Sequence, residues 1–300
     1  MIPRNWMRGY VGLALLANAA SGAQETKPEP ETAARLIAPV DLQGRLGKAE
    51  VRVLDARPKA DYEAGHLPGA VLLDTKAASE LAGKPGSLAD REAWAAWIKP
   101  LGLGPEICEV WIVDGKKQLD AARAWWLLTY LGVERVGLMD GNFGLWAREG
   151  RPVMKGATPV EPGDFPVKLR RDRLAMADDV LGALKDHSAK IIDARSLAEH
   201  TGERAMSKRG GHIPEACHLE WSDLVDDDGR FLAGSAVKDR LAKLGVKPGE
   251  AVITHCQGGG RASVDAFALE RLGLSARNYY LGWSDWGNRD ETPVVKETPK

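Results

Sequence analysis

The chain has 300 residues, enough for about two domains with substantial hydrophobic cores. Its 41 Lys and Arg residues nearly balance its 42 Asp and Glu residues, and no basic block or stripe favours binding to nucleic acid. A small anionic substrate remains compatible with this balance, because a few local donors decide such binding more than net charge does.

The first residues have the pattern of a secretory signal peptide. Arg4 and Arg8 make a positive start, and the apolar run 10–20 is shorter than the roughly 20 residues of a membrane-spanning helix. Small residues at 21–23 then offer a cleavage site. We therefore expect residues 1–23 to be removed and the mature protein to be periplasmic or secreted, without membrane attachment. An uncleaved membrane anchor is the alternative.

Strand and helix patterns alternate after a polar, proline-containing linker at residues 24–34. Val51–Leu54 predicts a buried strand, and Lys59–Ala64 predicts a helix. A second strand is predicted at Val110–Val113, followed by a helix that ends near residues 131–132. Such alternation is typical of an α/β fold.

The second part of the chain repeats the signals of the first. The recurring segments are DAR at 55–57 and 193–195, GHLPGA at 65–70 with GHIPEA at 211–216, the gap-free pair 110–132 and 251–273, and the tryptophan-containing pair 140–146 and 281–286. A repeat of this length indicates a duplicated domain rather than a solenoid unit.

Cys256 lies between a predicted strand and a predicted helix. Ala251–Thr254 predicts a short buried strand, and apolar residues from Ala262 to Leu272 recur at helical spacing, with Gly273 as a stop. The glycine-rich loop between them leaves backbone N–H groups that can converge on one anion. These donors and the helix dipole favour the thiolate of Cys256, which would make it a nucleophile. A buried cysteine beside a tight turn is the structural alternative.

The loop sequence CQGGGRAS at 256–263 resembles the active-site loop of rhodanese-type sulfurtransferases. The order of the repeated segments also resembles that family, over about residues 35–155 and again 173–292. The resemblance implies two tandem α/β domains, each a mostly parallel sheet with helices on both faces. We expect these domains at 35–155 and 173–300, joined by a linker at 156–172.

The His-Cys pair at 255–256 also resembles the signature of protein tyrosine phosphatases. In that signature five residues separate the cysteine from the arginine. Here only four residues separate Cys256 from Arg261. In the rhodanese group the shorter loop accompanies sulfur chemistry and the longer one phosphate chemistry. A cysteine phosphatase is therefore the less favoured interpretation.

The gap-free alignment places Cys256 opposite Gly115, so the first domain lacks the nucleophile and we expect it to be inactive. Lys116 and Lys117 follow Gly115, where they could face the second domain or form a solvated pair. His255 precedes the nucleophile, and because strand side chains alternate we expect it to point away from the thiol.

Residues outside the loop have expected roles from the same resemblance. It implies that Asp193 and Arg195 brace the cysteine loop, and that arginines in the insertion 201–210 bind substrate. Glu199 stands where the family often has an arginine, and Arg204 is expected to compensate for it. Arg209 is the alternative for that role, and a solvated position is the structural alternative for both.

The loop itself departs from two known patterns. Gly258 replaces the basic residue that thiosulfate enzymes usually carry, and the hydroxyl residues of mercaptopyruvate enzymes are absent. Neither donor is therefore favoured. Trp283 and Trp286 could line the active loop, as an aromatic pair does in the family, or pack in the core.

The predicted chemistry is transfer of a sulfur atom through a persulfide on Cys256, with no metal or organic cofactor. The thiolate would take sulfur from a small anionic donor such as thiosulfate or 3-mercaptopyruvate, and a thiophilic small molecule or a protein would accept it. A sulfur carrier or binding module with little turnover of small molecules is the alternative. The predicted anion-binding loop comprises Gln257, Gly258, Gly259, Gly260, Arg261 and Ala262.

The chain has three cysteines, Cys108, Cys217 and Cys256, which cannot all pair with one another. Cys108 and Cys217 lie in different halves. We expect them to be structural thiols and Cys256 to be the reactive one.

Overall fold

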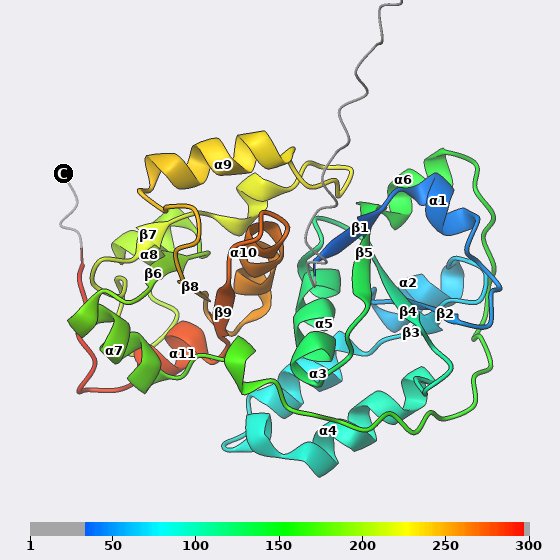
Figure 1. Ribbon diagram of the computed structural model, residues 1–300, viewed down its shortest axis with the longest axis horizontal. Helices are drawn as coiled ribbons and strands as arrows, with labels where there is room; N and C mark the ends of the chain where they lie inside the picture. Colours follow the sequence, from blue (N-terminus) through cyan, green and yellow to red (C-terminus); the bar gives the residue numbers. More distant parts are fainter. Residues whose placement is uncertain (1–33, 297–300) are drawn as a thin grey trace, which may run out of the picture. The chain divides into compact units, whose positions relative to one another are not determined.

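The computed structural model describes residues 34–296, which form two parallel sheets with helices around them (Figure 1). The strands are β1 Arg35–Ile37, β2 Val51–Asp55, β3 Val71–Leu72, β4 Glu109–Asp114, β5 Val136–Asn142, β6 Lys190–Asp193, β7 Cys217–His218, β8 Val252–His255 and β9 Ala276–Tyr279. The α-helices are α1 Pro39–Gln43, α2 Lys59–Ala64, α3 Thr75–Ala82, α4 Arg91–Ile98, α5 Leu119–Tyr130, α6 Phe143–Arg148, α7 Ala177–Asp186, α8 Leu197–Thr201, α9 Gly234–Lys243, α10 Gly260–Glu270 and α11 Gly282–Trp286. Short 3-10 helices occur at η1 Ser87–Ala89, η2 Lys99–Leu101, η3 Arg171–Arg173 and η4 Trp221–Leu224.

The two sheets share four strands in the same order. The first sheet is β1-β5-β4-β2-β3, and the second, read from its other edge, is β9-β8-β6-β7, so that β9 corresponds to β5 and β7 to β3. All strand pairs in both sheets are parallel. The counterpart of β1 is reduced to a single parallel bridge between Leu174 and Asn278. This correspondence confirms the predicted duplication and the α/β fold class.

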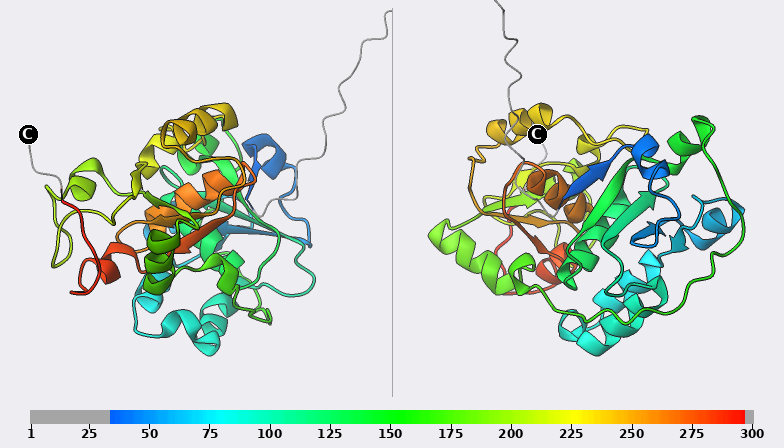
Figure 2. Two further views of the ribbon diagram at one scale, coloured as in Figure 1. Left: turned by 60° about the vertical axis from the view of Figure 1, so that its left-hand side comes forward. Right: turned by 45° about the vertical axis from the view of Figure 1, so that its right-hand side comes forward.

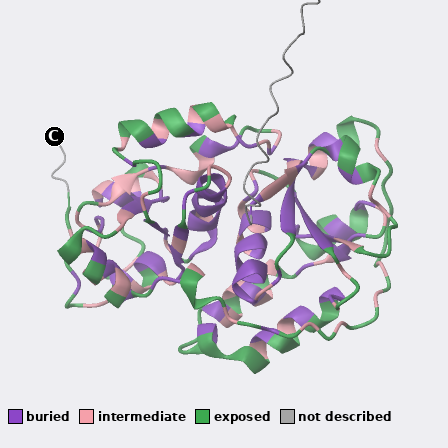
Figure 3. Ribbon diagram, in the orientation of Figure 1, coloured by how far each residue is buried: buried purple, intermediate pink, exposed green. Residues whose placement is uncertain are grey.

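Each sheet is buried on both faces, as expected for parallel strands with helices on either side. In β4, Ile112 belongs to the largest hydrophobic core, whereas Trp111 and Val113 belong to a second core on the opposite face. In β8, Val252 and Ile253 divide between two cores in the same way. The central strands are accordingly buried along most of their length (Figure 3).

Helices α5 and α10, from the two halves, pack against each other (Figures 1 and 2). Trp125 meets Phe267 edge to face with ring centroids 4.9 Å apart, and Trp126 stacks on Tyr280 at 4.8 Å. The largest core therefore contains residues of both halves. Because the cysteine loop leads directly into α10, this packing sets the loop against the first half.

Local predictions agree with the structure to within a residue or two. The predicted helix Lys59–Ala64 is confirmed, and the strand predicted at Ala251–Thr254 is β8, one residue further along. The predicted signal peptide lies outside the described residues. Within residues 34–296, no helix combines the length and apolar character needed to span a membrane.

Candidate active site

Cys256 follows the end of β8 and is 2% exposed. It packs with Ala194 and Ala262, against the half-buried Trp221. Gly259, the residue before α10, has a φ of +76°, in the left-handed region that favours glycine. A Cβ on Gly259 would also lie 2.3 Å from the Tyr280 ring, so the loop requires glycine here for two reasons.

The loop carbonyl groups of Cys256 and Gln257 accept hydrogen bonds, whereas many of the loop N–H groups donate none within the described residues. The N–H of Trp283 donates to the Cys256 oxygen at 2.7 Å, and that of Ser284 donates to the Gln257 oxygen at 2.9 Å. The N–H groups without an acceptor in the described part of the chain are those of Gln257, Gly258, Gly259, Arg261 and Ala262. Free amides around a strand–helix turn form a cradle for an anion.

The corresponding loop of the first half already holds an anion. The Asp114 carboxylate accepts hydrogen bonds from the N–H groups of Lys116 at 2.5 Å, Asp120 at 2.9 Å and Ala121 at 3.0 Å. Gln118 has a φ of +64°, which matches that of Gly259. In the gap-free alignment the three donors correspond to Gln257, Arg261 and Ala262. The backbone of this turn is therefore arranged to surround a negative group.

Arg261 forms a two-point ion pair with Glu199. Its Nη1 and Nη2 atoms lie 2.6 and 2.9 Å from the carboxylate oxygens, and Ser196 also donates to Glu199. Burial alone would raise the pKa of Glu199, but the Arg261 hydrogen bonds and charge outweigh it and lower the pKa to about 2. Glu199 thus neutralises Arg261, a partnership that the sequence alone did not reveal.

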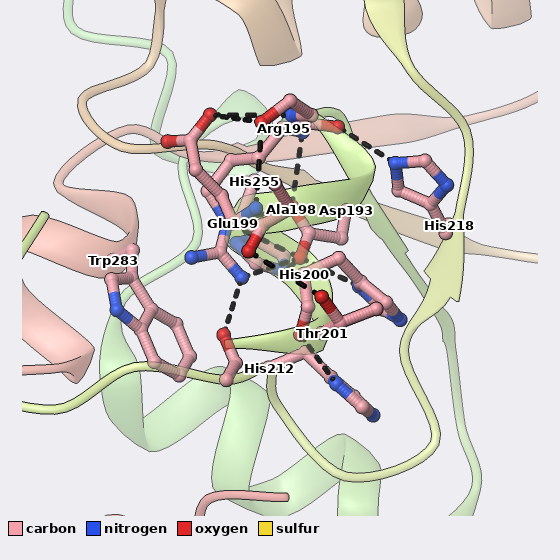
Figure 4. Close-up of polar contacts among 12 residues, drawn as sticks. Asp193, Arg195, Ala198, Glu199, His200, Thr201, His212, His218, His255 and Trp283 are labelled. Carbon is pink, nitrogen blue, oxygen red and sulfur yellow. Dashed lines mark hydrogen bonds and ion pairs between the residues drawn. The ribbon is translucent and has the colours of Figure 1, made fainter. Parts of the chain in front are cut away.

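Asp193 and Arg195 form a buried ion pair (Figure 4). Arg195 Nη2 lies 2.6 Å from Asp193 Oδ2 and donates to the Gly211 carbonyl at 2.8 Å, while its guanidinium covers the Trp283 ring at 4.3 Å. The first half repeats this pattern with Asp55, Arg57, the Gly65 carbonyl and the Phe143 ring. Because the arrangement also occurs where cysteine is absent, we interpret it as scaffolding.

Histidines gather around the same aspartate (Figure 4). His200 Nδ1 lies 2.9 Å from Asp193 Oδ2, and the fully buried His255 has its Nε2 atom 3.9 Å from that oxygen. Burial lowers the pKa of His255 to about 4, so it is neutral near pH 7. His255 is directed at Asp193, in line with the expectation that it is no general base for the thiol.

The insertion 201–210 reaches the loop through an unexpected residue. Gln257 Nε2 donates to Ser207 Oγ at 3.1 Å. Arg204 is exposed, and its side chain makes no hydrogen bond or ion pair within the described residues, so its substrate-binding role stays a prediction. Arg209 instead donates to carbonyl oxygens of Trp286, Arg289 and Thr292, which ties down the end of the chain.

The other candidates have structural surroundings. Trp283 and Trp286 are fully buried and donate from Nε1 to the carbonyls of Arg209 and Pro293, so both pack in the core. All three cysteines are free thiols, with Cys108 exposed and Cys217 partly buried. Among the described residues, no group of three or more His, Cys, Asp or Glu side chains is placed to hold a metal ion.

Comparison with known proteins places these features in a family. The model of the rhodanese-like domain matches residues 38–149 and again 176–289. A thiosulfate sulfurtransferase of Azotobacter vinelandii is 33% identical over 86% of this chain and 96% of its own. The sulfur carrier protein TtuD of Thermus thermophilus is 29% identical over 85% of this chain and 94% of its own.

A solved structure agrees. The crystal structure of SseA from Escherichia coli, described as a 3-mercaptopyruvate sulfotransferase with the rhodanese fold, superposes with a TM-score of 0.71. It is 26% identical, and the match covers 83% of this chain and 98% of that one. With two matched domains and relatives aligned over almost their full lengths, the chain belongs to the rhodanese family.

Proposed function

We propose that this protein is a sulfurtransferase that carries a sulfur atom as a persulfide on Cys256. Residues 173–300 form the catalytic domain, and residues 35–155 form an inactive copy that supports it. The Cys256 thiolate attacks the outer sulfur of thiosulfate, the bond between the two sulfurs breaks, and sulfite leaves with the electron pair. A thiophilic acceptor such as cyanide then takes the outer sulfur and regenerates the thiolate.

The main support for this proposal is the corresponding loop of the first half. There, Asp114 places a carboxylate within the amide cradle, where three N–H groups bind it. In the second half His255 replaces Asp114 and points toward Asp193, which leaves the equivalent amides without acceptors among the residues that the structure describes. The anion supplied at this position is the sulfur of Cys256, and preorganised donors would stabilise it as thiolate and as persulfide.

We propose thiosulfate or 3-mercaptopyruvate as the donor, on the basis of the names of the relatives. The loop favours neither, because Gly258 has no side chain and Glu199 neutralises Arg261. The donor must therefore be recognised largely by backbone N–H groups and by residues outside the loop.

A protein acceptor is the second candidate, supported by the relative named as a sulfur carrier. Met206 is 50% exposed, and its carbonyl accepts a hydrogen bond from Gln257 at 3.3 Å. An exposed apolar side chain beside the loop suits a protein surface better than an inorganic ion.

The test is sulfur transfer by the purified protein from thiosulfate and from 3-mercaptopyruvate to cyanide, with Cys256→Ser as the matched control. We expect turnover that requires Cys256 and shows ping-pong kinetics. Formation of a persulfide without turnover would favour the carrier function. Hydrolysis of an aryl phosphate without any persulfide would indicate a phosphatase.

We also propose export from the cytoplasm, supported by Arg4, Arg8 and the apolar run 10–20. N-terminal sequencing of protein from the export compartment should give a start near Gln24. A chain that begins at Met1 in the membrane fraction would contradict this.

A further inference from the structure

Under the proposed function, the Cys256 loop must bind an anionic donor although its own positive charge is largely engaged. Gly258 has no side chain, and the Arg261 guanidinium is bound at both Nη atoms by Glu199. Arg209 is engaged by backbone carbonyls, and the exposed side chain of Arg204 makes no hydrogen bond or ion pair within the described residues. Positive charge for the loop therefore has to come from elsewhere in the molecule.

Arg123, on helix α5 of the first half, lies against the loop of the second half. A Cβ built on Gly260 would lie 2.3 Å from its Nη2 atom and 2.6 Å from its Nε atom, so the guanidinium fills the space that a side chain would occupy. Its Nη1 atom donates to Ser79 Oγ at 2.5 Å. Its Nε atom is buried and has no hydrogen-bond partner within residues 34–296.

The acidic side chain that pairs with Arg123 neutralises its positive charge only weakly. Asp120 Oδ1 lies 3.9 Å from its Nη1 atom, and burial together with Asp114 raises the pKa of Asp120. Arg123 also lines a cavity of about 520 Å³ in the first half, which leaves 21% of its side chain exposed. The guanidinium thus keeps donor capacity while it touches the loop.

Tyr280 lies against the loop at the neighbouring glycine. Its ring packs against the Gly259 Cα and stacks on Trp126, which fixes its position. Its hydroxyl is buried and unpartnered within the described residues, an arrangement that is costly unless the group has a function or an unseen partner. Burial raises the pKa of Tyr280 to about 12; the positive charge of Arg123 opposes this rise and the negative charge of Cys256 adds to it.

We propose that Arg123 and Tyr280 together supply the positive potential and the hydroxyl donor that the Cys256 loop lacks, and that they thereby position and stabilise the anionic sulfur. This inference rests on the proposed sulfurtransferase function. It also assigns the first half a part in the reaction: α5 brings a cation to a loop that has no free cation of its own.

The roles of Arg123 and Tyr280 follow from the charges present when thiosulfate transfers its sulfur to Cys256. The thiolate and thiosulfate together carry three negative charges, as do the persulfide and sulfite that they form. No proton is needed, but all of this charge is concentrated beside one loop. The Arg123 guanidinium would lower the repulsion between thiolate and donor, and the Tyr280 hydroxyl would donate to the sulfur anion.

The test compares Arg123→Met, Arg123→Lys and Tyr280→Phe with the unaltered protein. Two quantities are measured: kcat/KM for thiosulfate, and the pH midpoint for alkylation of Cys256 by iodoacetamide. For Arg123→Met we expect about a tenfold loss of kcat/KM and a midpoint about one pH unit higher, because a nearby positive charge favours the thiolate. Arg123→Lys should retain most of both values. Tyr280→Phe should shift the midpoint in the same direction by less.

Matched controls separate this effect from damage to the interface. Arg173→Met removes a guanidinium that pairs with Glu270 and covers Trp125, and Tyr279→Phe removes a hydroxyl that donates to Asp285. Neither should move the alkylation midpoint. Wild-type midpoints and rates in both Arg123→Met and Tyr280→Phe would overturn the inference. Absence of any persulfide on the unaltered protein would instead overturn the proposed function.

Discussion

The loops at 114–121 and 255–262 correspond in the repeat but differ in the residue that lies among their backbone amides. In the first, the Asp114 carboxylate lies among the amides of Lys116, Asp120 and Ala121. In the second, the equivalent amides have no acceptor within residues 34–296, and Cys256 lies at the start of the turn. We infer from this difference that the turn itself binds an anion, and we propose that the residue at its start decides whether the loop is reactive.

The two loops also differ in what covers them. The turn 226–229 of the second half docks on the first-half loop, where Gln118 Nε2 donates to the Gly229 carbonyl at 2.6 Å and Lys117 pairs with Asp227 at 3.0 Å. The second-half loop instead meets Arg123 and Tyr280. One loop is closed by its partner domain, and the other receives a cation from it.

The largest expected effect comes from the nucleophile. Cys256→Ser should lower sulfur transfer by at least about a thousandfold, because an alkoxide is not available near neutral pH to replace the thiolate. Asp114→Ala, Lys116→Ala and Lys117→Ala should each change the rate by no more than a few-fold. Steady-state assays of the four variants test this asymmetry, and substantial turnover by Cys256→Ser would show that the active half is wrongly assigned.

The ion pair beside the active loop should give the next largest effect. Arg261→Met leaves the Glu199 carboxylate uncompensated near an anionic donor, and we expect kcat/KM to fall roughly tenfold to a hundredfold. The double variant with Glu199→Gln should recover part of this loss, because the repelling charge is then gone. Equal activity of the single and double variants would show that the uncompensated Glu199 carboxylate is not the cause of the loss.

The first-half loop offers a prediction about stability rather than rate. Asp114→Ala removes the acceptor of three N–H groups and should lower the free energy of unfolding by about 1–3 kcal/mol. Added sulfate should restore part of the loss by occupying the vacated cradle, and Asp114→Asn should be affected less. Thermal unfolding with and without sulfate measures both. If sulfate stabilises the Ala variant no more than the unaltered protein, the turn is not an anion cradle.

The smallest effect concerns Asp265, which corresponds to Ala124 in the first half. Asp265 is fully buried, neither carboxylate oxygen has a partner within the described residues, and burial together with Asp193 raises its pKa well above the ordinary value. Because the folded chain holds this proton more tightly than the unfolded chain, wild-type stability falls as the pH rises above the ordinary carboxyl range.

Asp265→Asn does not titrate, so its stability relative to the unaltered protein should improve with rising pH, by about 1 kcal/mol or more near neutrality. Denaturant unfolding at several pH values measures this difference. The exposed substitution Asp290→Asn serves as a control and should show no such gain. A difference that is independent of pH would show that folding does not raise the pKa of Asp265.

The duplication, the fold class and the position of Cys256 were predictable because they rest on local signals: strand and helix periodicity, a glycine loop and recurring motifs. Glu199 was noted as a departure, but its pairing with Arg261 joins residues 62 positions apart and leaves no local trace. The contact of Arg123 with the loop could not be predicted for the same reason, since it depends on how α5 and α10 pack. The contact of Tyr280 with Gly259 depends on how the chain after β9 folds back on the loop. The role of the Asp114 carboxylate could not be predicted either, because the three amides that bind it are brought together only by the folded turn.

The most direct test of the central claim is intact-mass analysis of the purified protein after treatment with thiosulfate, followed by mapping of the Cys256 peptide. We expect the added mass of one sulfur atom, at Cys256 only, removed again by cyanide and absent from Cys256→Ser. An adduct on Cys108 or Cys217 instead, or no adduct with any sulfur donor, would contradict it.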